Sequence, residues 1–217
     1  MESKIEKSEV TAEFKLLLVG DNKVGKTAFI NRHPIEKLEK KTIGAIDVEV
    51  NLVKLVTSYG TIQFNIWEAL GVETAEQLTE DFYINADCAI IMFDLTSRMS
   101  YKNVPLWYKE IIKYNEDIPI TLVGNKIDEK DIKVKAKHIT FHRKKNLTYN
   151  GISALANYRW ECPFVDLMKL LCNDSSLSLV EAPPLRAPDI SMSEEKIQHI
   201  EEERKLAEAP LPEDDDL

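Results

Sequence analysis

One stretch of the sequence has residue types and a spacing suited to binding phosphate. Residues 20–27 read Gly-Asp-Asn-Lys-Val-Gly-Lys-Thr and match the pattern G-x-x-x-x-G-K-(S/T), between an apolar run and a helical segment. Backbone N–H groups of such a loop, with the start of the next helix, form a positive cradle for the α- and β-phosphates of a nucleotide. Lys26 supplies charge for the β- and γ-phosphates, and the Thr27 hydroxyl is a ligand for Mg²⁺. The stretch therefore predicts a nucleotide-phosphate site.

A second motif, Asn-Lys-Ile-Asp at residues 125–128, follows the apolar run 119–124 directly. The carboxyl end of a strand is where open α/β sheets bind ligands. The Asp128 carboxylate can accept hydrogen bonds from the N1–H and exocyclic amine of guanine, whereas adenine presents the wrong pattern, and an unpaired buried carboxylate is costly. The tetrapeptide alone is a weak signal, but it is a strong one beside the phosphate loop. Ser153 and Ala154, at the end of the last predicted strand, supply a third loop, whose backbone could meet the guanine carbonyl.

The elements that must position these motifs alternate between strands and helices. Apolar runs at 14–19, 88–94 and 119–124 predict buried strands, and the segments 48–56 and 61–67 predict a hairpin. Further segments complete the pattern: a helix to about residue 32, a polar segment at 36–47, a helix at 100–115, a strand at 147–153 and a helix at 163–172. The prediction is an α/β fold with a mostly parallel, six-stranded sheet covered by helices on both faces.

Composition shifts divide the chain into one globular domain and appendages. A Ser- and Pro-rich stretch precedes a charged helical segment in which Ser191 and Glu194 have the spacing of a capping box. The predicted boundaries are a flexible N-terminus at 1–12, the globular domain at 13–173, a linker at 174–190, a C-terminal helix at 191–208 and an acidic tail at 209–217.

Composition also excludes several classes of function. The net charge is −9 over 217 residues, which argues against a general affinity for nucleic acid. Three widely spaced cysteines form no disulfide framework and no zinc pattern, and the scattered histidines form no metal set. No apolar run approaches membrane-spanning length, Glu2 replaces the glycine needed for myristoylation, and the C-terminus has no cysteine for prenylation. We expect a soluble, intracellular monomer without a membrane anchor.

The three motifs together resemble the small G proteins of the Ras superfamily. Further stretches, at residues 88–98, 101–105, 133–137, 141–147 and 214–217, are similar to the Ran-like branch of that superfamily, the GTPases of nuclear transport. The resemblance implies a P-loop small G-protein fold that binds GTP or GDP with Mg²⁺ and acts in the nucleus and the cytoplasm. It also implies importin- and exportin-type receptors and Ran-binding domains as partners, because in Ran-like proteins the tail and helix dock in the GDP form and are released with GTP.

Carried over residue by residue, the resemblance assigns roles to individual positions. Thr27 would bind Mg²⁺ directly, and Glu68 would bind it through water. The implied nucleotide contacts are Gly20, Asp21, Asn22, Lys23, Val24, Gly25, Lys26, Thr27, Ala28, Gly71, Asn125, Lys126, Asp128, Ser153, Ala154 and Leu155. The implied partner-binding residues are the basic run His142, Arg143, Lys144 and Lys145 and the tail residues Asp214, Asp215 and Asp216.

Five positions depart from the family pattern, among them Glu68, which keeps a carboxylate where the family has aspartate but is one methylene longer. Ala45 stands where family members carry the threonine of the first switch, and Val72 stands where they carry the water-orienting glutamine. Asn22 replaces a glycine and crowds the space where a glutamine or an arginine finger would enter, and Leu155 replaces a lysine near the base. By the GTPase template, losing the positioned water and the access of an arginine finger lowers the rate of hydrolysis by roughly 10³–10⁵. No catalytic residue is therefore intact, and we expect nucleotide binding with weak or absent hydrolysis.

Two alternatives to a slow Ran-type switch stay open. A pseudo-GTPase scaffold would present the same surfaces without a nucleotide cycle, whereas a nucleotide kinase would leave the 125–128 motif unexplained. Glu73 could position water in place of the missing glutamine, and Thr42 could serve as the switch threonine if the loop is re-registered.

Overall fold

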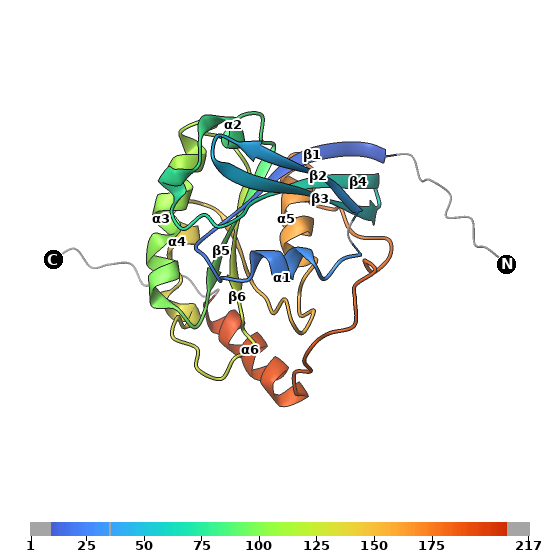
Figure 1. Ribbon diagram of the computed structural model, residues 1–217. Helices are drawn as coiled ribbons and strands as arrows, with labels where there is room; N and C mark the ends of the chain where they lie inside the picture. The colour runs from blue at the N-terminus through green and yellow to red at the C-terminus, as the bar shows by residue number, and fades with distance from the viewer. Residues whose placement is uncertain (1–9, 35, 208–217) are drawn as a thin grey trace.

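A computed structural model describes residues 10–34 and 36–207 (Figure 1). Within these residues, one sheet of seven strands, in the order β2-β3-β4-β1-β5-β6-β7, has helices on both faces. The elements are β1 Val10–Val19, α1 Lys26–Ile30, β2 Glu36–Ile43, β3 Ile46–Thr57, β4 Gly60–Ala69, η1 Ala75–Gln77, α2 Glu80–Tyr83, β5 Cys88–Asp94, α3 Arg98–Ile112, β6 Ile120–Asn125, η2 Ala136–His138, α4 Phe141–Lys144, β7 Thr148–Gly151, α5 Cys162–Leu171 and α6 Glu194–Ala207.

The predicted α/β architecture is confirmed. Strand β1 pairs in parallel with β4 on one side and β5 on the other, and β5, β6 and β7 continue the parallel series. Successive β1 side chains enter opposite layers: Leu17 packs in the apolar cluster with α3, and Leu16 packs in the cluster with α5. Because both faces of the sheet are covered, its central strands must be apolar throughout, and this is why their runs were visible in the sequence.

The predicted number of strands was wrong, because the polar segment at 36–47 contains an additional strand. Strand β2 pairs antiparallel with β3 at the edge of the sheet. Polar contacts hold it: Lys40 forms a 2.9 Å ion pair with Glu49, and the Lys41 ammonium lies 4.6 Å from the centre of the Trp67 ring. Edge strands carry charged residues that discourage pairing with other chains. An apolar pattern could not reveal such a strand, since cross-strand charges stabilise it.

The segment that follows α5 consists of a stretch without regular structure and then helix α6. Between α5 and α6 the chain has no helix or strand, apart from a bridge between Thr57 and Leu179. Helix α6 begins at Glu194, and its first turn is capped by Ser193, whose hydroxyl accepts from the Lys196 N–H at 3.3 Å. The predicted capping box from Ser191 is therefore wrong by two residues.

The other predicted boundaries are partly outside the described residues. Strand β1 begins at Val10, so residues 10–12 belong to the sheet and not to a separate N-terminal segment. Residues 1–9 and the predicted tail at 209–217, with Asp214, Asp215 and Asp216, lie outside the described part of the chain.

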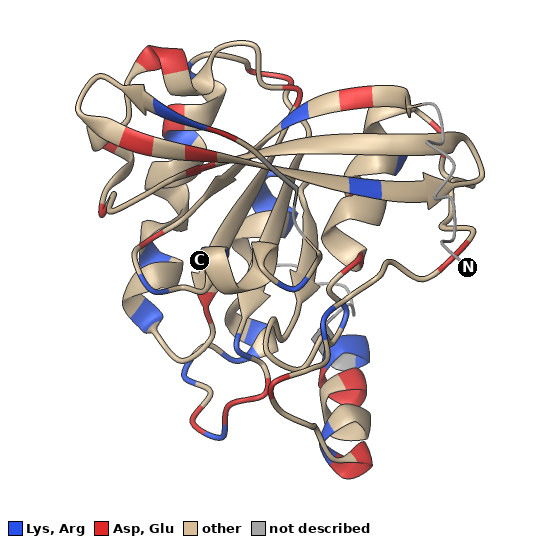
Figure 2. Cartoon of the chain, turned by 45° about the vertical axis from the view of Figure 1, so that its right-hand side comes forward, with Lys and Arg blue, Asp and Glu red and all other residues tan. Residues whose placement is uncertain are grey.

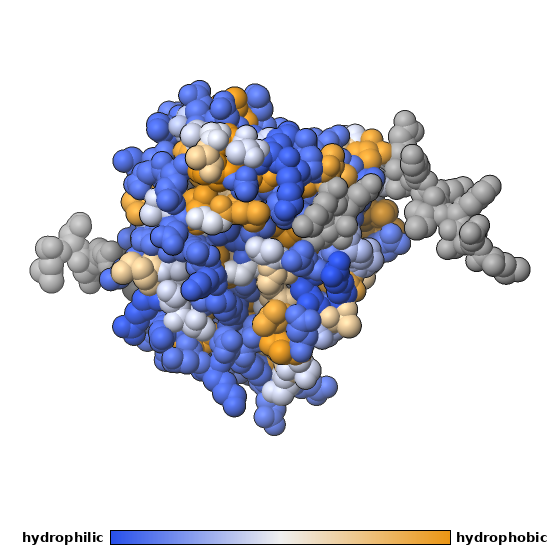
Figure 3. Space-filling view, in the orientation of Figure 1, coloured by the Kyte–Doolittle hydropathy of each residue, from blue (hydrophilic) through white to orange (hydrophobic). Residues whose placement is uncertain are grey.

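The surface is mostly hydrophilic in the view of Figure 3, with apolar residues in separate patches. Both signs of charge follow one another along α6 (Figure 2). Among the described residues, no helix is long and apolar enough to cross a membrane, and no group of three or more His, Cys, Asp or Glu side chains could hold a metal ion.

Trp160 anchors the helix that follows the phosphate loop. Its indole is fully buried and donates a 2.7 Å hydrogen bond to the Phe29 carbonyl of α1. The same ring packs on Phe29, Phe164 and His33. Because α1 has only five residues and little stability of its own, this contact fixes its position.

We expect Trp160→Phe to lower the free energy of unfolding by about 1–3 kcal/mol, since it removes the buried donor and leaves a void. Urea denaturation followed by circular dichroism measures the change. Trp67→Phe is the matched control, because Trp67 is half-buried and its ring keeps its lysine neighbours, so its loss stays below about 1 kcal/mol. Equal losses in the two variants would contradict the role given to Trp160.

Candidate functional site

Two glycines let the phosphate loop lie against its surroundings. A Cβ on Gly20 would lie 2.0 Å from the Met92 carbonyl oxygen of β5, so no side chain fits there. Gly25 has φ +104°, in the left-handed region, and a Cβ there would lie 2.2 Å from Nδ2 of Asn125. Close approach of the loop to β5 and β6 therefore depends on these two residues, as the sequence pattern implies.

The Lys26 ammonium lies across the loop. Its Nζ donates to the carbonyls of Gly20 at 2.7 Å and Asp21 at 2.9 Å. Burial lowers the pKa of Lys26, and the nearby carboxylates of Glu68 and Asp21 partly oppose that shift. The cation is thus held over the same loop whose N–H groups form the predicted cradle.

Helix α3 holds the loop from the other side through an interaction that the sequence did not reveal. The Asp21 carboxylate accepts hydrogen bonds from Trp107 Nε1 and from Asn103 Nδ2, each at 2.8 Å. No local pattern announces these contacts, because the partners lie more than 80 residues away. The only available signal was two polar donors four residues apart on one face of a predicted helix.

The predicted Mg²⁺ residues are brought together. The Thr27 hydroxyl donates a 2.6 Å hydrogen bond to the Glu68 carboxylate at the end of β4. Glu68 is 2% exposed, and Lys26 is the cation near it. A hydroxyl and a carboxylate beside a phosphate cradle fit the oxygen ligands that Mg²⁺ prefers. Thr27 would hold the ion, which would neutralise phosphate charge, with Glu68 in its water shell.

Asn125 joins all three predicted loops. Its side chain is buried, donates to the Val24 carbonyl at 3.0 Å and accepts from the Ala154 N–H at 3.0 Å. One amide therefore connects the phosphate loop, the 125–128 motif and the loop that begins at Ser153. The predicted site residues are close in space for this reason.

The other residues of the second motif have distinct environments. The Lys126 ammonium forms a 2.5 Å ion pair with Asp94, the last residue of β5, and Lys126 has φ +69°. Among residues 10–34 and 36–207, no hydrogen bond or ion pair involves the Asp128 carboxylate. Asp128 is half-buried in the loop that follows β6.

The third loop is closed by its own hydrogen bonds. Ser153 is buried, and its hydroxyl accepts from the Ala156 N–H at 3.0 Å. The Leu155 side chain is exposed, while its carbonyl accepts a 2.8 Å hydrogen bond from the Asp189 N–H of the C-terminal segment. A lysine side chain is absent at this position, and the backbone contact with residue 189 was not predicted.

Residues 71–73 lie on the side of the loop where a γ-phosphate would be bound. They offer no polar side chain that is buried there. Val72 is 6% exposed and borders a void of about 10 Å³ together with Gly20 and Lys26. A void of this size holds about one water molecule, and Val72 offers it no hydrogen-bond partner. Gly71 has φ +70°, and a Cβ added to it would meet nothing within 4 Å. The side chain of Glu73 is exposed.

The first-switch residues lie in the β2–β3 hairpin. Ala45 is exposed at its turn, next to Gly44. The Thr42 hydroxyl donates to the Asp47 carboxylate at 3.1 Å, inside the hairpin. In this arrangement Thr42 therefore bonds to its own hairpin and not to the Mg²⁺ residues.

The predicted basic run is only partly a free surface. His142 is half-buried, and its ring stacks on Tyr149 at 5.2 Å between centroids. The Lys145 ammonium lies 5.5 Å from the centre of the Tyr108 ring, and both Lys144 and Lys145 are exposed. The run ends helix α4, where cations interact favourably with the helix dipole.

A phosphate loop between a parallel strand and a helix, with two further loops at the carboxyl ends of β6 and β7, defines a P-loop nucleotide-binding domain. The sequence model of the Ras family matches residues 15–173, and the chain belongs to the Ras family. Ras-family proteins are GTP-binding switches, and they bind GTP or GDP, typically with Mg²⁺.

We expect Gly25→Ala to weaken GDP binding by about tenfold or more, because its Cβ would displace the Asn125 amide that joins the loops. Titration with a fluorescent GDP analogue measures the affinity. Gly44→Ala is the matched control, since Gly44 also has a positive φ but has its nearest contact at 3.7 Å, in the β2–β3 turn. A Gly25 variant that binds as tightly as the Gly44 variant would remove the structural role of this close approach.

Proposed function

We propose that this protein is a guanine-nucleotide-binding switch of Ran type that acts in nucleocytoplasmic transport, with weak or absent intrinsic GTP hydrolysis. The observation that carries the proposal is the docking of its C-terminal segment on the loops that would hold the base. The Asp189 N–H bonds to Leu155, and the Lys196 ammonium of α6 bonds to the carbonyls of Asp128 and Glu129. Both base-recognition loops therefore contact the segment.

A buried arginine fixes the linker beside these loops. Arg32, just after α1, forms a 2.9 Å ion pair with Asp189 and donates to the carbonyls of Arg186 and Ala187. Its Nε donates to the Asn157 side chain at 2.7 Å, and its own carbonyl accepts from the Arg186 N–H at 2.7 Å. The Arg32 guanidinium thus connects the helix after the phosphate loop, the third loop and the linker. This connection supports the proposal that docking of the segment depends on the bound nucleotide.

The transport role rests on the Ran-like sequence features together with this docked segment. In such a role the partners are importin- and exportin-type receptors and Ran-binding domains, and the protein acts as a monomer in the nucleus and the cytoplasm. Release of the segment would expose the surface under α6. Nucleic acid is no partner in this proposal, since the chain carries a net charge of −9.

Weak hydrolysis follows from the apolar surroundings of the γ-phosphate side. Val72 cannot orient a water molecule, and Ala45 offers no hydroxyl to the metal or the γ-phosphate. Lys26 and Thr27 bind the ground state as well as the transition state, so they raise affinity more than rate. The protein would therefore keep for a long time the nucleotide that it acquires by nucleotide exchange.

We expect Val72→Gln with Ala45→Thr to raise the rate of single-turnover GTP cleavage by about tenfold or more, because the pair restores a water-positioning amide and a switch hydroxyl. Quenched-flow measurement with radiolabelled GTP gives the rate. Val72→Met with Ala45→Thr is the control, since methionine matches the length of glutamine without its amide. If the Gln and Met variants cleave GTP equally slowly, the explanation of the defect is wrong.

We also expect nucleotide to control the C-terminal segment. With a non-hydrolysable GTP analogue, amide hydrogen exchange in residues 186–207 should be faster than with GDP, and a Ran-binding domain should bind about tenfold more tightly or better. Exchange followed by mass spectrometry and a binding titration measure the two effects. Identical exchange and affinity in both nucleotide states would contradict a switch.

The alternative is a pseudo-GTPase scaffold that presents these surfaces constantly. The absent switch residues at Ala45 and Val72 favour it. Chromatography of the supernatant after denaturing the purified protein separates the two proposals: bound GDP or GTP supports the switch, and an empty supernatant with no uptake of added nucleotide supports the scaffold.

A further inference from the structure

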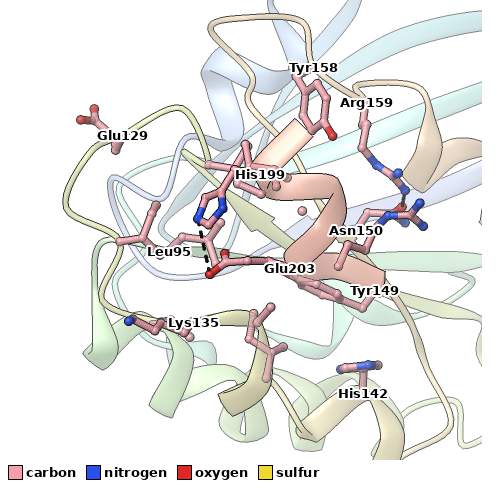
Figure 4. Close-up of a pocket in the computed structure, with 18 of the residues that line it drawn as sticks. Leu95, Glu129, Lys135, His142, Tyr149, Asn150, Tyr158, Arg159, His199 and Glu203 are labelled. Atoms are coloured by element: carbon pink, nitrogen blue, oxygen red, sulfur yellow. Dashed lines mark hydrogen bonds and ion pairs between the residues drawn. The ribbon is translucent and has the colours of Figure 1, made fainter. Parts of the chain in front are cut away.

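A large cavity lies away from the phosphate loop, between α6 and the edge of the sheet (Figure 4). Its volume is about 920 Å³, within the range of about 300–1,000 Å³ typical of small-molecule sites. One wall is apolar and comes from the loops around β5, β6 and η2 and from α6. The apolar wall consists of Leu95, Ile127, Ile132, Val134, Ile139 and Ile200.

The lining of this cavity is positively charged, against the acidic balance of the whole chain. Six Lys or Arg residues and three Asp or Glu residues line it, in a protein whose net charge is −9. Two of the acidic groups are already engaged: Asp166 accepts from Asn150 at 2.7 Å, and Glu203 pairs with His199 at 3.8 Å. The cavity therefore favours an anion over a cation.

Arg159 is a half-buried cation in this lining. Its Nη2 donates to the Asn150 side chain at 3.2 Å, its Nε is buried without a hydrogen-bond partner, and within the described residues it forms no ion pair. A half-buried charge without a carboxylate partner loses part of its hydration, which costs free energy. The backbone of Arg159 also has φ +55°, a conformation unfavourable for a residue with a side chain.

A second set of contacts orients this guanidinium. The Asp166 carboxylate of α5 holds the Asn150 amide, and the amide oxygen is thereby turned toward Arg159. Asn150 is buried, so its amide has a fixed direction. Charged groups held by an outer layer of hydrogen bonds in this way are typical of binding sites.

His142 adds a flat surface without a second charge. Burial, and then the nearby Arg143, lower the pKa of His142, so its imidazole is neutral near pH 7. It stacks on Tyr149, and both residues line the cavity; in Figure 4 Tyr149 lies beside Asn150 and His142 lies below them. The cavity thus combines one cation, Arg159, which can bind a negatively charged group, with aromatic and aliphatic walls.

We propose that this cavity binds a small amphipathic anion, with its negative head on Arg159 and its apolar body against the wall formed by Leu95, Ile127 and Ile200. The ligand class is an organic acid with an apolar chain or ring, of the kind represented by medium-chain carboxylates. Because α6 forms one side of the cavity, the bound anion joins α6 to the sheet. No residue of the phosphate loop takes part, so failure of nucleotide binding would leave this inference standing; because Lys196 and Ile200 of α6 line the cavity, a bound anion would favour the docked segment of the proposed function.

The test uses the full-length protein loaded with GDP and the fluorescent probe 8-anilinonaphthalene-1-sulfonate, an anion with an aromatic body. We expect saturable binding at one site per chain and displacement of the probe by decanoate. Arg159→Met keeps much of the side-chain stem and removes the charge, so probe affinity should fall by about tenfold or more. The matched control is Arg98→Met, at an exposed arginine outside the cavity, and its affinity should stay within about twofold of the parent.

A second variant covers the case in which Arg159→Met fails to fold. Ile200→Trp places a larger side chain in the cavity from α6 and should abolish probe binding, while the circular dichroism spectrum stays unchanged. Three results would overturn the proposal: equal probe affinity in the Arg159 and Arg98 variants, undiminished binding to a folded Ile200→Trp protein, or probe fluorescence that falls as GDP concentration rises. The last result would place the probe at the nucleotide site.

Discussion

The nucleotide site depends on one buried amide. Asn125 donates to the phosphate loop through Val24 and accepts from the third loop through Ala154. A net hydrogen bond contributes only about 1 kcal/mol, but a buried amide with its partners removed costs more than that. The Asn125 amide fits only because Gly25 has no side chain, so the conformation of the phosphate loop and that of the base-recognition motif depend on each other. The three motifs of the sequence thus form one structural unit and not three separate signals.

The two sides of that unit differ in character. The side that would face the base is polar, ordered by hydrogen bonds, and covered by the linker and α6 through Asp189 and Lys196. The side that would face the γ-phosphate is lined by Val72, and of the described residues around its void only Lys26 carries a charged side chain. Such an asymmetry suits a protein that distinguishes nucleotides by binding them and leaves their cleavage to a slow background reaction.

Apolar periodicity predicted the central strands, the hairpin of β3 and β4, and the main helices, because burial on both faces of a sheet determines those residue types. The phosphate-loop pattern and the 125–128 motif placed the site residues together for a similar reason: both follow parallel strands of one sheet. Strand β2 was not predictable in this way, since ion pairs such as Lys40 with Glu49 stabilise it and they resemble an ordinary charged loop. Contacts between distant segments, such as Asp21 with Trp107, leave no local pattern at all.

The edge position of β2 has a kinetic consequence. The strand pairs with β3 along its length, from Glu36 opposite Leu52 to Ile43 opposite Ile46, in an antiparallel ladder with one irregularity between Lys37 and Glu39. Moving Ala45 toward the phosphates requires the hydrogen bonds between β2 and β3 to break, starting at the turn. Each broken hydrogen bond weakens the next pair. Each hydrogen bond contributes about 1 kcal/mol, and several of them must break together. The hairpin should consequently rearrange as a cooperative unit with a sizeable barrier, so that the protein keeps its previous conformation for some time after its surroundings change.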